Sequence, residues 1–323
     1  MTFDICFFEA FAEEEHALVT LLPKHITAQF VSHTIQESGV KKPPAALISI
    51  RTQSRVPDEW LPHISGILSR TTGYDHLLPY ISHVPCGYLP NYCTQSVAEQ
   101  ALLFIFSLAR KLPQQLLHFQ DFNRNNLTGI ELRDKHVLIV GMGNIGYAIY
   151  TLTKALGMKP QGVDITRAHK NVAYTDIHTG IRDADFIISA MNLTSHNKGY
   201  FSYALLKQAK KGAFFINVAR GEHASAVDLL QLMQEKHLGG IALDVYTDEP
   251  HVAALFRSKK KNHNQEFQAL LALSHTENVI LTPHNSFNTI EAVAEKTRQT
   301  VEQIIRFIQK KQFTWQLPNQ PSL

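Results

Sequence analysis

The chain has 323 residues, of which 44% are hydrophobic, and this length and composition are typical of a globular protein with two domains. Its 31 lysine and arginine residues nearly balance 28 aspartate and glutamate residues, so the formal net charge is +3. This balance argues against nucleic acid and against an anionic membrane surface as partners.

The cysteines and the N-terminal residues indicate a cytoplasmic protein. Cys6, Cys86 and Cys93 form no C-x-x-C pair, which fits a reducing compartment without a disulfide framework. The first residues, MTFDICFFEAFAEEEH, lack the basic region of a signal peptide. The longest apolar run, residues 101–109, is too short to span a bilayer.

The first hundred residues alternate short apolar runs with helical patterns, and none carries a glycine-rich phosphate loop. Residues 3–8 and 45–49 are predicted strands. Ser96 followed by Glu99 is a capping-box pattern, which predicts the start of a long apolar helix. We expect this helix to run through Leu112, with Pro113 near its end or at a kink.

The middle of the chain has a regular alternation of apolar strands and helical patterns. Strands followed by helices in this way predict a parallel sheet that is covered on both faces. After it, from Asn288 to about Ile308, the chain has a helix-start signal and an amphipathic pattern. The predicted strands of the middle region are residues 136–141, 159–165, 184–192, 212–220, 239–246 and 278–283, with helices such as 203–210 and 226–236 between them.

The segment GMGNIG, residues 141–146, fits the dinucleotide-binding pattern G-x-G-x-x-G. It follows a predicted strand and opens a predicted helix, which is the context that the pattern needs. Gly141 allows a tight turn, Gly143 lets a pyrophosphate approach the backbone, and Gly146 lets helix and strand pack closely. The helix N-terminus then offers free N–H groups to the anion.

Asp164 lies at the end of GVD in the next predicted strand, 23 residues after Gly141. A carboxylate at this place accepts hydrogen bonds from the ribose hydroxyls of the cofactor and repels a 2′-phosphate. We therefore predict NAD rather than NADP, although Arg167 is close enough in sequence to weaken that preference.

Three further predicted strands end at ionisable residues, namely Arg220 in NVARG, Glu249 in LDVYTDEP and His284 in LTPHN. Each could be an ordinary loop residue, and the chain has 17 histidines. Ligands of doubly wound sheets lie outside the carboxyl ends of the strands, so these three groups are predicted to meet in one crevice. Together with the glycine loop they indicate an active site.

These motifs resemble the D-isomer-specific 2-hydroxyacid dehydrogenases. The likeness runs in family order through GYDHL (73–77), SVAEQ (96–100), GMGNIG, NVARG, LDVYTDEP and TPHNSFNT. The resemblance implies two Rossmann-like, doubly wound parallel sheets, with the cofactor domain (100–287) inserted in a discontinuous substrate domain (1–99 and 288–323). It also implies a homodimer, for which the apolar helix 97–112 is the candidate contact, and no metal.

The resemblance implies that Arg220, Glu249 and His284 are the catalytic residues. Arg220 would bind the carboxylate of a 2-keto acid in a bidentate pair. His284 would protonate the carbonyl oxygen as hydride arrives from the cofactor, and an ordinary imidazole, with a pKa of about 6.5, suits this exchange. Glu249 would fix the imidazole tautomer and favour its charged form.

Further site residues follow from the same resemblance. Thr72 and Gly73 would meet the substrate carboxylate through their backbone. Asn192 stands where the family usually has a proline, and Asp244 could hold the nicotinamide carboxamide. The residues implied to contact the cofactor are Gly141, Gly143, Asn144, Ile145, Gly146, Asp164, Met191, Asn192, Asn197, Val218, Ala219, Arg220 and Asp244.

At position 287, in PHNSFNT, this chain has Phe, which resembles the D-lactate branch of the family more than the branches with Gly there. This resemblance favours a small or apolar 2-keto acid as substrate. Tyr88 and Tyr92 could line the pocket or belong to the core. Formate dehydrogenases pair the histidine with glutamine rather than with a residue like Glu249. An NAD(H)-sensing corepressor on the same fold is the alternative, because such proteins can keep all three catalytic residues.

Overall fold

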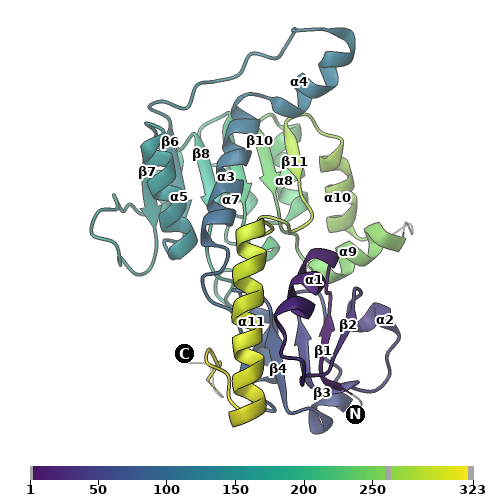
Figure 1. Ribbon diagram of the computed structural model, residues 1–323. Helices are drawn as coiled ribbons and strands as arrows, with labels where there is room; N and C mark the ends of the chain where they lie inside the picture. The colour runs from purple at the N-terminus through teal and green to yellow at the C-terminus, as the bar shows by residue number, and fades with distance from the viewer. Residues whose placement is uncertain (1–2, 259–262, 319–323) are drawn as a thin grey trace. The chain divides into compact units, whose positions relative to one another are not determined.

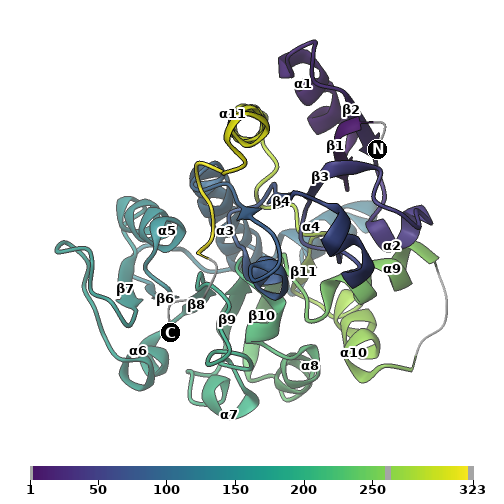
Figure 2. The same ribbon diagram turned by 90° about the horizontal axis from the view of Figure 1, so that it is seen from below.

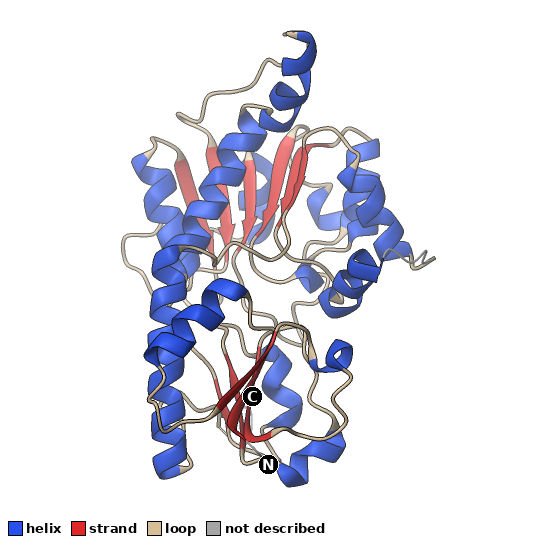
Figure 3. Ribbon diagram, turned by 45° about the vertical axis from the view of Figure 1, so that its right-hand side comes forward, coloured by secondary structure: helices blue, strands red, loops and turns tan. Residues whose placement is uncertain are grey.

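The computed structural model describes residues 3–258 and 263–318. The chain forms two compact units, one made of Met1–Cys93 with Asn288–Leu323 and the other of Thr94–Phe287. The crossings therefore lie at 93/94 and 287/288, whereas the sequence predicted 99/100 and 287/288. Each unit contains one parallel β-sheet, and the two sheets are separate (Figure 3). The predicted fold class, two doubly wound parallel sheets, is confirmed.

The sheet of the first unit has the strand order β2-β1-β3-β4-β5, and all its pairings are parallel. The long helix α11 packs against α1, so the C-terminal part of the chain completes this unit (Figure 1). The elements are β1 (Phe3–Phe8), α1 (Ala12–Leu21), β2 (Ala28–Val31), α2 (Ile35–Ser38), β3 (Ala45–Ile50), η1 (Asp58–His63), β4 (Gly66–Ser69), η2 (Asp75–Tyr80), β5 (Cys86–Gly87) and α11 (Ile290–Lys310).

A cluster of charged side chains is buried in this unit. Glu14 of α1 forms ion pairs with Arg70, which follows β4, and with Lys296 of α11, each at 2.9 Å through Oε1. The three side chains are at most 1% exposed. Burial raises the pKa of Glu14, but Arg70 and Lys296 outweigh it and lower that pKa to about 2. Burial lowers the pKa of Lys296 to about 7, although Glu14 opposes the shift.

The sheet of the second unit has the parallel order β11-β10-β9-β8-β6-β7. Helices α3 and α5 cover one face, and α6, α7, α8 and α10 cover the other (Figure 2). The elements are α3 (Thr94–Ala109), α4 (Leu112–His118), η3 (Phe119–Asp121), β6 (His136–Val140), α5 (Asn144–Ala155), β7 (Lys159–Val163), α6 (Ile177–Asp183), β8 (Phe186–Ser189), α7 (Tyr203–Leu206), β9 (Ala213–Asn217), η4 (Gly221–His223), α8 (Ala226–Gln234), β10 (Leu238–Leu243), α9 (Glu249–Ser258), α10 (Gln265–Ser274) and β11 (Val279–Leu281).

Two predicted helix starts were wrong. Helix α3 begins at Thr94, so Ser96 lies inside it as a buried residue rather than at its N-cap. This helix ends at Ala109, and Pro113 lies in the first turn of α4, where a proline costs no helical hydrogen bond. Helix α11 is capped by Thr289, whose side chain accepts a hydrogen bond from the Ala292 N–H, so the cap lies one residue after the predicted Asn288.

Residues 251–277, which match no motif named above, contain most of α9 and all of α10. Helix α10 packs against α8, and the Glu266 carboxylate accepts a hydrogen bond from the Ala226 N–H at 2.8 Å. The lysine run in this segment, residues 259–261, lies outside the described residues.

Among the described residues, no helix is both long and apolar enough to cross a membrane. The three cysteines are free thiols and are all buried. Burial raises the pKa of Cys6 and of Cys86 to about 12, so these two sulfurs remain protonated at neutral pH.

Candidate active site

The predicted site residues of the second unit lie at the carboxyl edge of its sheet. The glycine loop follows β6, Asp164 follows β7, and Met191 and Asn192 come shortly after β8. Arg220, Glu249 and His284 follow β9, β10 and β11, which are neighbours in the sheet. Because all six strands are parallel, the topology brings these groups to one edge, as the sequence predicted.

The glycine loop has the shape that its three glycines permit. Gly141 has φ +98°, a conformation that other residues rarely adopt. A Cβ on Gly146 would lie 1.9 Å from the Gly141 carbonyl oxygen, so only glycine lets α5 begin this close to β6. A Cβ on Gly143 would meet nothing within 4 Å. The backbone at Gly143 therefore faces open space at the N-terminus of α5.

Asp164 is bound to the glycine loop. Its carboxylate accepts hydrogen bonds from the Met142 N–H at 2.6 Å and from the Thr166 N–H at 2.9 Å. His169 contacts the same loop, because its Nε2 lies 3.0 Å from the Met142 carbonyl oxygen and its ring stacks on Tyr147. The Arg167 guanidinium lies over the Tyr174 ring. These contacts fix the segment after β7 against the segment after β6.

The loop after β8 is closed by Asn197. Its side-chain amide donates to the Asn192 carbonyl oxygen at 2.7 Å, and its side-chain oxygen accepts from the Thr194 N–H at 2.8 Å. The turn therefore forms with asparagine at position 192.

The loop after β9 is shaped by Asn217, a residue that sequence reasoning missed. Its amide nitrogen donates to the Arg220 carbonyl oxygen at 2.8 Å, and its oxygen accepts from the Ala219 N–H at 3.1 Å. A Cβ on Gly221 would lie 1.8 Å from the Tyr246 carbonyl carbon, so glycine is required where this loop passes the one after β10. Asn217 and Gly221 thus fix the backbone at the two ends of the segment 218–220, which contains Val218 and Arg220.

His284 and Glu249 form a pair at this edge. The His284 Nδ1 lies 2.8 Å from both carboxylate oxygens of Glu249, and the side chains are 19% and 13% exposed. A carboxylate can only accept a hydrogen bond, so Nδ1 carries a proton and Nε2 is the nitrogen that can exchange one. This hydrogen bond therefore favours the tautomer with the proton on Nδ1.

Asp244 holds the loop that carries His284. It is 1% exposed, and its carboxylate accepts from the Thr282 hydroxyl at 2.6 Å, the Asn285 N–H at 2.8 Å and the Ser286 N–H at 2.9 Å. His284 itself has φ +51°, which is strained for a residue with a Cβ. The three hydrogen bonds that Asp244 accepts stabilise this backbone conformation of His284. A contact from Asp244 to the nicotinamide stays a prediction.

Comparisons with known proteins match this arrangement to one family. The family model of the D-isomer specific 2-hydroxyacid dehydrogenase, NAD binding domain, matches residues 102–286. The chain belongs to this family.

Similar proteins include an aromatic 2-oxoacid reductase of Clostridium sporogenes, 30% identical over 68% of this chain and 67% of that protein. A D-specific alpha-keto acid dehydrogenase of Enterococcus faecium is 25% identical over 93% of this chain and 95% of the other. Among solved structures, the D-lactate dehydrogenase of Aquifex aeolicus complexed with NAD and lactic acid has a TM-score of 0.84 and 23% identity, and the match covers 99% of this chain and 100% of that one.

The residues present fit the NAD that this family's domain binds. The open space at Gly143 and the N-terminus of α5 can receive a pyrophosphate, and the Asp164 carboxylate lies beside the same loop. Among the described residues, no cluster of histidine, cysteine and acidic side chains could hold a metal. The individual cofactor contacts of Asn144, Ile145, Met191 and Ala219 stay predictions.

The predicted substrate residues Thr72 and Gly73 lie in the first unit, in the loop after β4. Phe287 is 6% exposed and Tyr92 is 8% exposed. The Tyr88 ring lies against Tyr74 at 5.1 Å. Substrate contacts of these side chains stay predictions.

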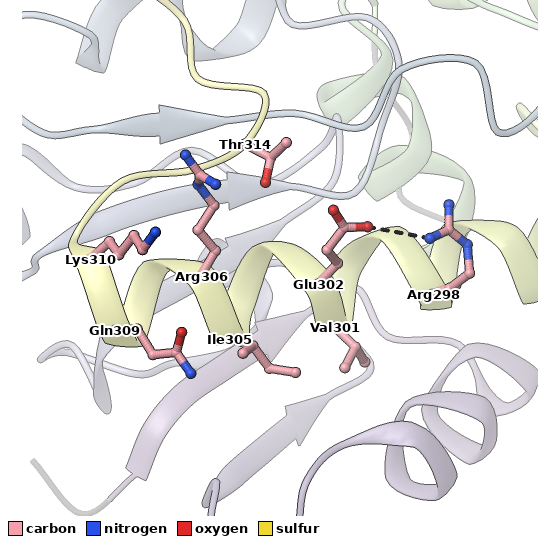
Figure 4. Close-up of a pocket in the computed structure, with 8 residues that line it drawn as sticks. All are labelled: Arg298, Val301, Glu302, Ile305, Arg306, Gln309, Lys310 and Thr314. Atoms are coloured by element: carbon pink, nitrogen blue, oxygen red, sulfur yellow. Dashed lines mark hydrogen bonds and ion pairs between the residues drawn. The ribbon is translucent and has the colours of Figure 1, made fainter.

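A hollow of about 500 Å³ in the first unit contains none of the predicted site residues. It runs along α11 and ends at Thr314 (Figure 4). Arg298, at one end of it, pairs with Glu302 at 3.2 Å, and Arg306 extends toward Thr314. Because the family's motifs lie elsewhere, this hollow is not the active site.

Proposed function

We propose that the protein reduces a small or apolar 2-oxo acid to its D-2-hydroxy acid with NADH and catalyses the reverse reaction with NAD⁺. The observation that carries the proposal is the His284–Glu249 pair, with Nδ1 held at 2.8 Å by both carboxylate oxygens. It lies at the same sheet edge as a glycine loop that fits the cofactor.

Each catalytic residue has one role in this proposal. NADH, when bound, supplies the hydride to the carbonyl carbon. His284 donates its Nε2 proton to the carbonyl oxygen, so that the ketone becomes an alcohol. Glu249 accepts the Nδ1 hydrogen bond, which orients the ring before the transfer and keeps Nδ1 protonated after it. Arg220 binds the substrate carboxylate through two N–H groups and polarises the adjacent carbonyl.

The experiment is NADH oxidation by purified protein with a panel of 2-oxo acids. Pyruvate, 2-oxoisocaproate and phenylpyruvate cover the range from small to aromatic side chains. Turnover of at least one acid, with a D-2-hydroxy acid as product, supports the proposal. If NADH binds tightly and no acid is reduced, the NAD(H)-sensing alternative replaces it.

We also propose that the protein is a homodimer, and that its contact is the α3–α4 surface, defined as the exposed apolar side chains of α3, α4 and the residues that follow. Leu116, Leu117 and Phe119 are 66%, 65% and 75% exposed, and a short segment that exposes several large apolar side chains is typical of an interface. Helix α4 lies beyond the end of its own sheet (Figure 1). The other members of the surface are Leu103, Phe106, Leu112 and Phe122.

The oligomeric state tests this second proposal. Light scattering after size exclusion should give a dimer for the natural protein and a monomer for the double variant Leu116→Asp, Phe119→Asp. Val19→Asp is the matched control, because Val19 is 60% exposed on α1 in the other unit. A dimer that survives the double variant would contradict the proposed contact.

We also propose a cytoplasmic location, which the three buried free thiols support.

A further inference from the structure

The loop after β4 offers two backbone donors. Among the described residues, no protein acceptor receives the N–H of Thr72 or of Gly73. Both residues are partly exposed. The family resemblance predicts that this backbone binds the substrate carboxylate, and two such N–H groups can bind an anion only if the loop holds them in a fixed direction.

A chain of hydrogen-bonded side chains ends on this loop. The Thr71 hydroxyl donates to the Gly73 carbonyl oxygen at 2.7 Å. The Ser69 hydroxyl lies 2.6 Å from the Thr71 hydroxyl, and the His76 Nε2 lies 2.8 Å from the Ser69 hydroxyl. Ser69 is fully buried and Thr71 is 6% exposed, so water does not compete for the bond between these two hydroxyls.

The direction of each hydrogen bond in this chain is determined. The Gly73 carbonyl oxygen can only accept, so Thr71 uses its one hydroxyl proton there. Thr71 must then accept from Ser69, and Ser69, whose proton is used, must accept from His76. His76 therefore carries a proton on Nε2. The relay runs from His76 through Ser69 and Thr71 to the Gly73 carbonyl.

The base of this relay is rigid. The Thr71 carbonyl oxygen accepts from the Leu89 N–H at 3.0 Å. Arg70, between Ser69 and Thr71, is fully buried and donates to Glu14 at 2.9 Å and to the Phe8 carbonyl oxygen at 2.7 Å. These hydrogen bonds hold the backbone at Arg70 and Thr71 in place. The conformation of residues 71–73 therefore depends on the Thr71 hydroxyl.

We propose that His76, Ser69 and Thr71 are positioning residues for substrate binding, which fix the Thr72 and Gly73 N–H groups in the direction that a 2-oxo acid carboxylate requires. This inference rests on the proposed function. The three side chains act through the loop backbone, so they change the affinity for the acid and leave both the hydride step and NADH binding unaltered.

The main test compares Thr71→Val, which removes the hydroxyl at nearly constant volume, with Thr71→Ser, which keeps it. Losing the hydrogen bond to the Gly73 carbonyl oxygen should raise the KM for the 2-oxo acid about three- to tenfold in Thr71→Val. The kcat and the Kd of NADH should stay within about twofold, and Thr71→Ser should restore the KM. Ser69→Ala should raise the KM in the same direction, and it serves as the second variant if Thr71→Val does not fold.

The matched control is Thr300→Val, because Thr300 is a buried threonine of the same unit whose hydroxyl donates within α11. Its KM should equal that of the natural protein. The inference is overturned if Thr71→Val keeps the natural KM, if Thr71→Ser fails to restore it, or if Thr300→Val raises it equally. A natural protein that reduces no 2-oxo acid would instead contradict the proposed function, so the two failures are distinguishable.

Discussion

The two units carry charged clusters that differ in their exposure. In the second unit, His284 and Glu249 are 19% and 13% exposed, and His284 has a strained backbone. In the first unit, Glu14, Arg70 and Lys296 are at most 1% exposed, and the Glu14 carboxylate pairs with both cations. Partial exposure lets a proton move between His284 and a substrate. Full burial leaves the other cluster only a structural role, so changes to it should alter stability and not NADH binding.

The largest expected effect follows from removing the charge at the centre of the buried cluster. Glu14→Gln leaves two buried cations without their carboxylate and should lower the free energy of unfolding by about 3–5 kcal/mol. Urea unfolding of Glu14→Gln measures the loss, and the exposed neighbour Glu15 supplies the control Glu15→Gln. Equal stabilities for the two variants would remove the distinction between the clusters.

The pH dependence of stability should report Lys296. The pKa of Lys296 is about 7 when folded, against an ordinary value of 10.5, so the unfolded chain binds more protons between these values. Stability should therefore rise with pH in this window, by about 1–3 kcal/mol between pH 7 and pH 9 from this group. Lys296→Met should remove that rise. Lys310→Met, on the exposed side of the same helix, should retain it.

Glu14 contributes in the acid range, where stability also rises with pH because the unfolded chain again binds more protons. Its pKa is lowered to about 2 from 4.5, so its stabilisation is complete above pH 4.5 and is lost as the pH falls toward 2. Acid unfolding of Glu14→Gln should accordingly lack this component.

Changing the partner of the catalytic histidine should affect turnover with little effect on stability. Glu249→Gln keeps one acceptor oxygen but offers a donor NH₂ group in place of the second carboxylate oxygen, so it holds Nδ1–H less firmly. We expect kcat to fall roughly 10–100-fold, because the tautomer and the orientation of the proton donor are less fixed. Steady-state kinetics and a melting curve measure both effects. A variant that loses stability as Glu14→Gln does would place Glu249 among the structural charges.

The smallest effect concerns the choice of cofactor. The Asp164 carboxylate lies beside the glycine loop, so kcat/KM should be at least about tenfold higher with NADH than with NADPH. Asp164→Asn, which keeps the size of the side chain, should bring the kcat/KM values for NADH and NADPH closer together. Equal values in the natural protein would mean that a nearby cation such as Arg167 outweighs the carboxylate.

Much of the second unit was predictable because its residues follow local rules. The glycine loop and Asp164 have fixed spacings, and Arg220, Glu249 and His284 each follow an apolar strand. Asn217 was missed, and Asp244 was expected at the nicotinamide rather than as a support of the His284 loop. Both residues act through hydrogen bonds that no short pattern encodes. Ser96 was assigned as a cap because the capping box describes one turn, whereas packing of α3 on α5 decides where the helix begins.

The buried cluster of the first unit was not predictable for a different reason. Glu14 and Lys296 come from opposite ends of the chain and meet only because α1 packs against α11. The relay from His76 to Gly73 lies within eight residues, but its hydrogen bonds depend on the turn after β4. The residue types of the buried cluster and of the relay also occur on ordinary loops and helix surfaces, so residue type alone does not predict either of them.

The most direct test of the proposed catalytic role of His284 is the kcat of His284→Ala measured beside the Kd of NADH. The kcat for the best 2-oxo acid should fall roughly 10²–10⁴-fold, because the proton donor is lost, while NADH binds as before. A kcat near that of the natural protein would contradict the assignment of His284 as the acid and base of the reaction.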